Sequence, residues 1–170
     1  MSARYLVEST VDLIHDEIKS KIASALSEVK SLYNDHLVTL EVPQNYFIYP
    51  VAAGYRTPAV FIIADDVDFQ KRTRGANHIS ATVSVNVSVL VEDKDRLRLT
   101  TKAFRYQDAL HKILDQTRLT TPDGKLALTV LVTRASFSPL YSDTADANSP
   151  IAMFRKEVVL TLEVEHWENF

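Results

Sequence analysis

One short segment near the start of the chain carries side chains that could share a metal ion. Asp12, His15 and Asp16 lie three and four residues apart, which would place them on one face of a helix. Two carboxylates and an imidazole are common on a solvated helix surface, and the neighbouring sequence supplies no fourth ligand. We therefore interpret these residues as helix surface and predict no metal site there.

A second acidic cluster follows an apolar run in the first half of the chain. Asp65, Asp66 and Asp68 resemble an oxygen-ligand set for calcium, but an EF-hand loop needs glycine at its sixth position and glutamate at its twelfth. The sixth residue counted from Asp65 is Gln70, and the glutamate is missing as well. We interpret this cluster as the solvated end of a strand.

The residue types on which most enzymes depend are scarce or scattered. The sequence has no cysteine, which excludes thiol nucleophiles, zinc ribbons and disulfides. Its five histidines form no ligand pair, no serine stands in a Gly-x-Ser-x-Gly elbow, and its three glycines are too far apart for a phosphate-binding loop. We predict that the protein is not an enzyme and holds no cofactor. A catalytic carboxylate pair stays open, because any two of 22 acidic residues could meet in space.

Length and charge bound the class of protein. A chain of 170 residues most naturally forms one domain, so we expect a single domain over residues 1–170. Nineteen basic and 22 acidic residues give a net charge of −3, which argues against nucleic-acid binding through a global basic field. Because the chain has neither a signal-like start nor an apolar run of about 18 residues, we expect a cytosol-made protein with no membrane partner.

Two segments have the spacing of amphipathic helices. Between Thr10 and Tyr33 apolar residues recur every three or four positions, and Ser9 or Thr10 could cap this helix. A second run, from about Arg98 to Gln116, has the same single apolar stripe. A single stripe indicates that each helix lies on a neighbouring surface.

Alternating apolar and polar residues predict a sheet. The two longest alternations run from Ile79 to Val91 and from Ala152 to Trp167, and a shorter one, Leu126 to Val132, follows a turn at Thr121–Gly124. Three further strand candidates are Leu37–Val42, Tyr46–Tyr49 and Pro58–Ala64. The last of these is an apolar run that we expect to be buried on both faces. We predict an α+β fold: an antiparallel-rich mixed sheet with two long strands, packed by two amphipathic helices on one face.

The length of the two long strands suggests an assembly. About 13 residues extend to about 43 Å, whereas a chain of this size should have a radius of gyration of about 15 Å. We therefore expect part of each strand to project or to lie along a neighbouring copy. A closed ring would cover such exposed strands, and a monomer with a wide, twisted sheet is the alternative.

The order of these elements resembles a family of bacteriophage proteins. The pattern consists of a long N-terminal helix (Leu13 to Tyr33), the strand Pro58-Ala-Val-Phe-Ile-Ile, the alternating strand 79–91, a turn and helix from Asp93 to Leu114, and a terminal strand Phe154-Arg-Lys-Glu-Val-Val-Leu-Thr-Leu-Glu-Val. This order is similar to that of the tail-terminator and neck (head–tail joining) proteins of long-tailed phages. The resemblance covers nearly the whole chain, and the family has no catalytic signature.

The resemblance implies a structural role in a virion. Such a protein forms a hexameric ring at the head-proximal end of the tail, stops polymerisation of the tail-tube protein and joins a head-completion or connector protein. DNA passes through the lumen without specific binding, for which an acidic or neutral wall suits better than a basic one. The implied location is the tail or neck of the virion, after assembly in the host cytoplasm.

The loops supply candidate contacts between copies in such a ring. We expect basic residues on one rim and acidic residues on another to pair around the circle. These interface candidates are Arg56, Lys71, Arg72, Arg74, Asp93 and Asp95. Three alternatives stay open: another neck or connector ring protein, a small ligand-binding or enzymatic α+β domain, and a module that binds peptides by strand addition.

Overall fold

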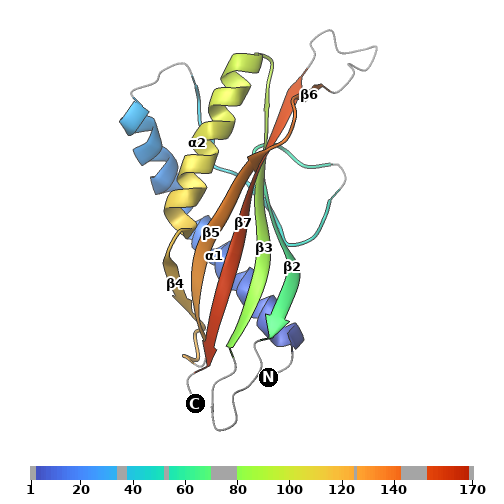
Figure 1. Ribbon diagram of the computed structural model, residues 1–170. Helices are drawn as coiled ribbons and strands as arrows, with labels where there is room; N and C mark the ends of the chain where they lie inside the picture. Colours follow the sequence, from blue (N-terminus) through green and yellow to red (C-terminus); the bar gives the residue numbers. More distant parts are fainter. Residues whose placement is uncertain are drawn as a thin grey trace.

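The chain forms a curved sheet with two helices packed on one side of it. The computed structural model describes residues 3–33, 38–51, 54–69, 80–124, 126–142 and 153–168. In chain order the elements are α1 (Ala3–Tyr33), β1 (Asn45–Phe47), β2 (Ala59–Phe69), β3 (Ser80–Asp93), α2 (Arg96–Leu114), β4 (Thr117–Thr120), β5 (Leu126–Phe137), β6 (Tyr141–Ser142) and β7 (Phe154–Glu168). Figure 1 shows α1 and β7 extending along most of the length of the molecule.

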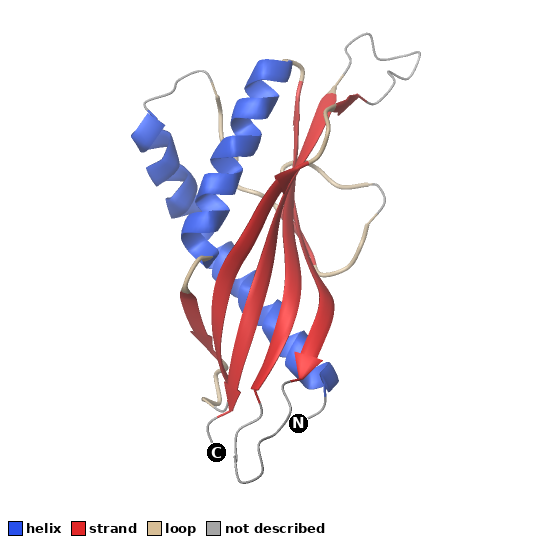
Figure 2. Cartoon of the chain, viewed as in Figure 1, coloured by secondary structure: helices blue, strands red, loops and turns tan. Residues whose placement is uncertain are grey.

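The strands join in one mixed sheet. Their order is β1-β2-β3-β7-β5-β4, and β6 pairs with the start of β7. Among the described strands, only the short β1 runs parallel to its neighbour, and the other pairings are antiparallel. Both helices lie on the same side of the sheet, as Figure 2 shows. The predicted fold class is therefore confirmed.

Alternation along the strands decides which side chains face the helices. Five valines of β3 are at most 2 % exposed: Val83, Val85, Val87, Val89 and Val91. They belong to the same core as Ile14, Ile18 and Ile22 of α1, which are fully buried. Burying each such side chain is worth about 1.5–3 kcal/mol of transfer free energy, so this layer stabilises the packing of α1 on the sheet.

The first helix begins earlier than its sequence pattern indicated. It starts at Ala3, and the prediction that Ser9 or Thr10 caps it is wrong. Leu6 is only 5 % exposed because it continues the apolar stripe one turn upstream. Thr10 is fully buried inside the helix, where its hydroxyl donates a hydrogen bond to the Leu6 carbonyl at 2.7 Å. Of the two helices described, neither has an apolar stretch that could cross a membrane.

Two of the strand predictions were wrong in their extent. Residues 38–44 have no regular structure, so the predicted strand Leu37–Val42 does not form over its described residues. The aspartates from Asp65 to Asp68 do not end β2, which bulges between Ala64 and Asp66 and continues to pair with β3 as far as Phe69. Burial of both faces of β2 is confirmed for its first residues, Ala59–Ile62.

The two long strands shelter each other. Residues 80–93 of β3 pair with residues 154–167 of β7 without interruption. The other side of β3 pairs with β2, and the other side of β7 pairs with β5. The expectation that these strands need cover from neighbouring copies is wrong, because a wide twisted sheet places both of them at its centre.

Candidate functional site

The sheet face opposite the helices, which we call the outward face, is polar and acidic at one end. The strand registers place small polar residues of β3 beside carboxylates of β2 and β7. The acidic residues of this face are Asp65, Asp66, Asp68, Glu163 and Glu165, and all five are exposed. Across β7, the register puts Arg134 of β5 on the same face. This end of the sheet therefore presents a negative surface with a basic border.

Hydrogen bonds between side chains order the middle of the outward face. Asn86 of β3 donates to the carboxylate of Asp65, and Thr161 of β7 donates to the Asn86 side-chain oxygen at 3.1 Å. Thr133 of β5 donates to the Thr161 carbonyl at 3.1 Å. The result is a polar row across four strands, whose members hold one another in place.

The other end of the outward face is apolar. Phe61 of β2 stacks on Phe47 of β1 with ring centroids 5.3 Å apart, and Tyr55 meets Phe61 edge-on at 5.4 Å. Beside them lies a cavity of about 220 Å³, lined in part by Val51 and Leu90. These rings pack as a second small core on this face.

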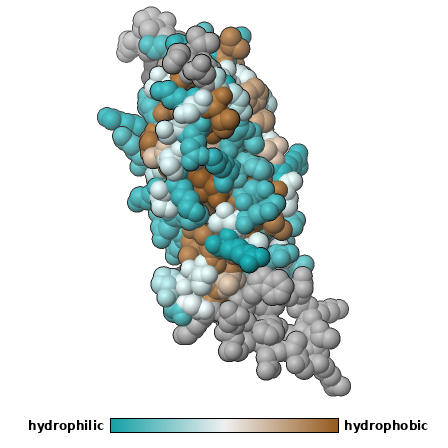
Figure 3. All heavy atoms as spheres, turned by 90° about the vertical axis from the view of Figure 1, so that its left-hand side faces the viewer, coloured by the Kyte–Doolittle hydropathy of each residue, from teal (hydrophilic) through white to brown (hydrophobic). Residues whose placement is uncertain are grey.

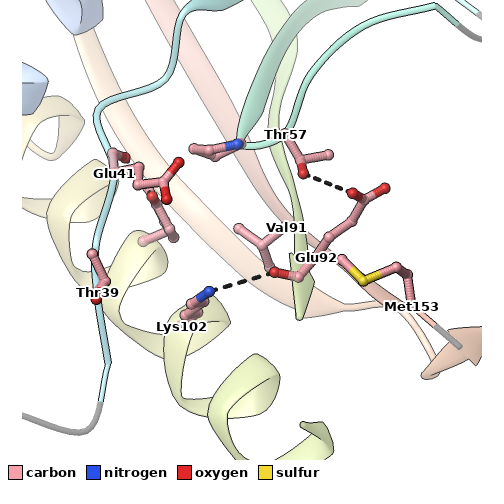
Figure 4. A pocket seen from close by; sticks show the side chains of 9 residues that line it. Thr39, Glu41, Thr57, Val91, Glu92, Lys102 and Met153 are labelled. Atoms are coloured by element: carbon pink, nitrogen blue, oxygen red, sulfur yellow. Dashed lines mark hydrogen bonds between the residues drawn. The ribbon is translucent and has the colours of Figure 1, made fainter. Parts of the chain in front are cut away.

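A second cavity, of about 210 Å³, lies between α2 and the segment that precedes β1 (Figure 4). Lys102 of α2 approaches it and donates to the Glu92 carbonyl at 3.5 Å. Thr57 donates to one oxygen of the Glu92 carboxylate at 3.0 Å, and Arg155 pairs with the other. Lys102 also pairs with Asp93 at 2.6 Å, so these groups are bound within the chain, whereas the exposed Glu41 lines the same cavity.

The ligand-binding alternative predicted a pocket elsewhere. A pocket with convergent polar groups near Asp65, His78 or His111 would favour it. Neither Asp65 nor His111 lines the two cavities described above, and His78 lies outside the described residues.

The predicted interface residues differ in what the structure shows of them. Arg56 is exposed in the loop before β2, and its carbonyl accepts a hydrogen bond from the Asn45 amide at 2.8 Å. Lys71, Arg72 and Arg74 lie outside the described residues. The roles of these four in assembly stay predictions.

The two acidic candidates have partners in their own chain. Asp93 is 9 % exposed and accepts from Lys102 at 2.6 Å, from Arg98 at 3.3 Å and from the Asp95 backbone at 2.9 Å. Burial acts to raise the pKa of Asp93, but these three partners together hold it below its ordinary value. Asp95 caps α2 by accepting from the Arg98 backbone at 2.8 Å. Both residues stabilise the start of α2, and their contact with other copies stays a prediction.

The described residues hold no group of three or more side chains arranged for a metal ion. His15 lies 2.9 Å from the Asp16 carboxylate, and its ring meets Tyr46 edge-on at 5.7 Å. Asp12 is exposed on α1. Asp16 is exposed as well, and His15 is half-buried.

One buried polar contact was missed by the sequence analysis. His166 of β7 is 1 % exposed, and its Nε2 atom lies 2.6 Å from the Thr10 hydroxyl. Its Nδ1 atom lies 3.2 Å from the Ala81 carbonyl. The alternation of β7 placed His166 on the buried face, but no local pattern indicates that Thr10, 156 residues away, is its partner. The contact ties α1, β3 and β7 together.

Comparison with known proteins finds a weak likeness among solved structures. Comparison with protein families finds no match, and neither does comparison with curated proteins. Among solved structures, the chain is similar to a chain described as "Virion of native gene transfer agent (GTA) particle", with 14 % sequence identity and a TM-score of 0.41. The match covers 87 % of this chain and 94 % of the other. At this level of similarity no function is transferred from it.

Proposed function

We propose that the protein is a structural subunit of a phage-like particle, and specifically a tail terminator. It would form a ring at the head-proximal end of the tail, stop the tail tube from growing and join the tail to the head. The order of elements on which the resemblance rests supports this proposal. A long helix, a strand, a long strand, a helix, a strand and a long strand follow one another along the chain.

The observation that carries the proposal is the outward face. Two helices seal one side of the sheet, while five exposed carboxylates line part of the other. A face with this charge repels phosphate, so DNA could slide past it without being held. We therefore assign the outward face to the lumen of the ring. Termination itself needs no chemistry, because a subunit that matches the tube on one side only prevents further addition.

The remaining interface candidates belong to the same proposal. In the ring, Arg56 would lie near the acidic start of α2 in the next copy, whereas Lys71, Arg72 and Arg74 follow the opposite end of β2 (Ala59–Phe69) and would meet the next copy there. Since Asp93 already binds two cations of its own chain, Asp95 is the acid better placed to meet a neighbour.

The oligomeric state of the purified protein tests the proposal. We expect rings in negative-stain electron micrographs and a mass of about 115 kDa by light scattering, six times the 19.2 kDa chain. Added tail tubes should become capped at one end. A protein that stays at 19.2 kDa at high concentration and leaves tubes uncapped contradicts the proposal. Rings that bind a head connector but no tail tube would favour another neck protein, the second candidate.

A further inference from the structure

The sheet has two edges that its own short strands cover only in part. On one side, β1 pairs with Ala59–Phe61 of β2, and no described strand pairs with the outer side of residues 62–69. On the other side, β4 pairs with Ala127–Val130 of β5, and no described strand pairs with the outer side of residues 131–137. We call these two segments the β2 edge and the β5 edge. One backbone donor in each segment is bonded to a side chain: Val67 N–H to Asp66 at 2.7 Å and Val132 N–H to Asp115 at 3.3 Å. No described strand occupies the other outward donors and acceptors, which are open to a further strand.

The two edges have opposite charge. The β2 edge carries Asp66 and Asp68, both exposed. The β5 edge carries exposed Arg134, and exposed Arg118 lies beside it on β4. Within the described part of the chain, Asp68, Arg118 and Arg134 have no hydrogen-bond or ion-pair partner. Uncompensated charges of opposite sign therefore stand at opposite edges of one sheet.

Strand directions make the two edges compatible. β2 is antiparallel to β3, β3 to β7 and β7 to β5, so β2 and β5 run in opposite directions. If a second copy lies beside the first in the same orientation, its β5 edge runs antiparallel to the β2 edge of the first. Asp66 pairs with Ser84 and Arg134 with Thr161, which places both charges on the outward face. The antiparallel pattern of the four central strands would then continue from one molecule into the next.

We propose that the β2 edge of one copy docks on the β5 edge of a second copy, with Asp66 and Asp68 facing Arg134 and Arg118. The contact is heterologous, because each copy uses two different surfaces and keeps one of each kind free. The bulges between Ala64 and Asp66 and between Val132 and Arg134 disturb both edges. Together with the aspartates, they disfavour pairing with an arbitrary strand and leave a matched partner as the best fit.

The docking contact adds detail to the proposed function. It depends on that function only in the statement that repeated contacts close into a ring. Repetition of the same contact, with a fixed rotation at each step, gives a closed circle. Because the sheets continue from copy to copy, one wall of that circle consists of outward faces and the other of helices.

Disulfide cross-linking tests the contact directly, because the chain has no cysteine of its own. Asp66→Cys and Arg134→Cys are made as two separate proteins, mixed and oxidised. We expect a disulfide-linked dimer that contains one chain of each variant. Lys19→Cys, at an exposed position of α1, mixed with Asp66→Cys is the matched control and should stay uncross-linked. A dimer formed by either edge variant alone indicates a two-fold contact and overturns the inference.

Charge reversal gives a second, independent measurement. Arg134→Glu or Asp66→Lys alone should shift the mass in light scattering from the oligomer towards the single chain, and both changes in one chain should restore the oligomer. Lys19→Glu, which changes the charge to the same extent on α1, should leave the mass unchanged, and a thermal melt of each variant checks that it is folded. Rings that persist in Arg134→Glu and give no cross-link overturn the docking mode and leave the proposed function standing. A wild-type protein that is only a single chain overturns both.

Discussion

At the scale of single residues, the hydrogen bonds of the buried His166 bear on its protonation state. Three contacts form a chain: Ala81 carbonyl to Nδ1, Nε2 to the Thr10 hydroxyl, and that hydroxyl to the Leu6 carbonyl. A neutral imidazole has one N–H and the threonine one O–H, so together they can donate only two of these three hydrogen bonds. An imidazolium has two N–H groups, and with the threonine it can donate all three. Burial opposes the charge, and the pKa of His166 is lowered by that burial despite the backbone acceptors.

This arrangement predicts a loss of stability in mild acid. Since the pKa of His166 is lower in the folded chain than its ordinary 6.5, the unfolded chain binds the proton more readily. The free energy of unfolding should therefore fall as the pH drops from about 7.5 to about 5.5. His166→Gln, which does not titrate, should show a smaller fall in urea denaturation. His111→Gln, at an exposed position on α2, is the control, and an undiminished fall in His166→Gln would refute the assignment.

At the scale of elements, the start of α2 shows how one short sequence joins a strand to a helix. Asp93 ends β3 and holds Lys102 and Arg98, and Asp95 accepts the hydrogen bond from the backbone of Arg98. The helix therefore begins with its first turn fixed to the last residue of the preceding strand.

Removal of the cap should weaken this junction. Asp95→Ala leaves a backbone donor without its acceptor and should lower the free energy of unfolding by about 1 kcal/mol, measured by chemical denaturation. Asp95→Ser keeps an oxygen in the capping position and should retain most of the stability. Equal losses in the two variants would show that the cap is not the cause.

Periodicity and turn residues in the sequence predicted a long strand, a helix and a turn. The alternation of valines between 79 and 91 and the single stripe of α2 each correspond to a described element. The turn at Thr121–Gly124 is also confirmed, with Gly124 at φ +71° and its N–H bonded to the Thr121 carbonyl at 2.8 Å.

The wrong predictions share one cause, which is contact between parts of the chain that are distant in sequence. Asp65 to Asp68 look like the end of a strand, but pairing with β3 carries β2 through them. Thr10 looks like a cap, yet upstream packing of Leu6 extends the helix past it. The pattern of residues 154–168 gives their length, but not that β3 and β5 flank them. The acidic outward face became visible only when the register joined carboxylates from β2 and β7.

At the scale of the whole molecule, charge is distributed unevenly between the two sides of the sheet. In the side view of Figure 3, apolar side chains surface in small groups between hydrophilic ones. On the outward face, Asp66 and Asp68 of β2 and Glu163 and Glu165 of β7 lie on either side of β3, and all four are exposed. A net charge of −3 therefore understates how acidic this face is.

Reversal of this charge should convert the face into one that holds DNA. The double change Glu163→Lys and Glu165→Lys moves the net charge from −3 to +1, since each substitution adds two positive charges. We expect DNA retention in a mobility-shift assay at low salt, lost as the salt concentration rises. The matched control, Asp12→Lys with Asp16→Lys, makes the same change on α1 and should retain less. Equal retention by both would mean that net charge alone matters.

The central position of β7 has a mechanical consequence. Its backbone is bonded to β3 on one side and to β5 on the other over most of its length. A force that pulls along the strands must therefore break the hydrogen bonds to both neighbours at the same time, because it cannot break them one after another. A subunit built in this way resists a pulling force along its central strands, which suits the proposed position between a virion head and its tail.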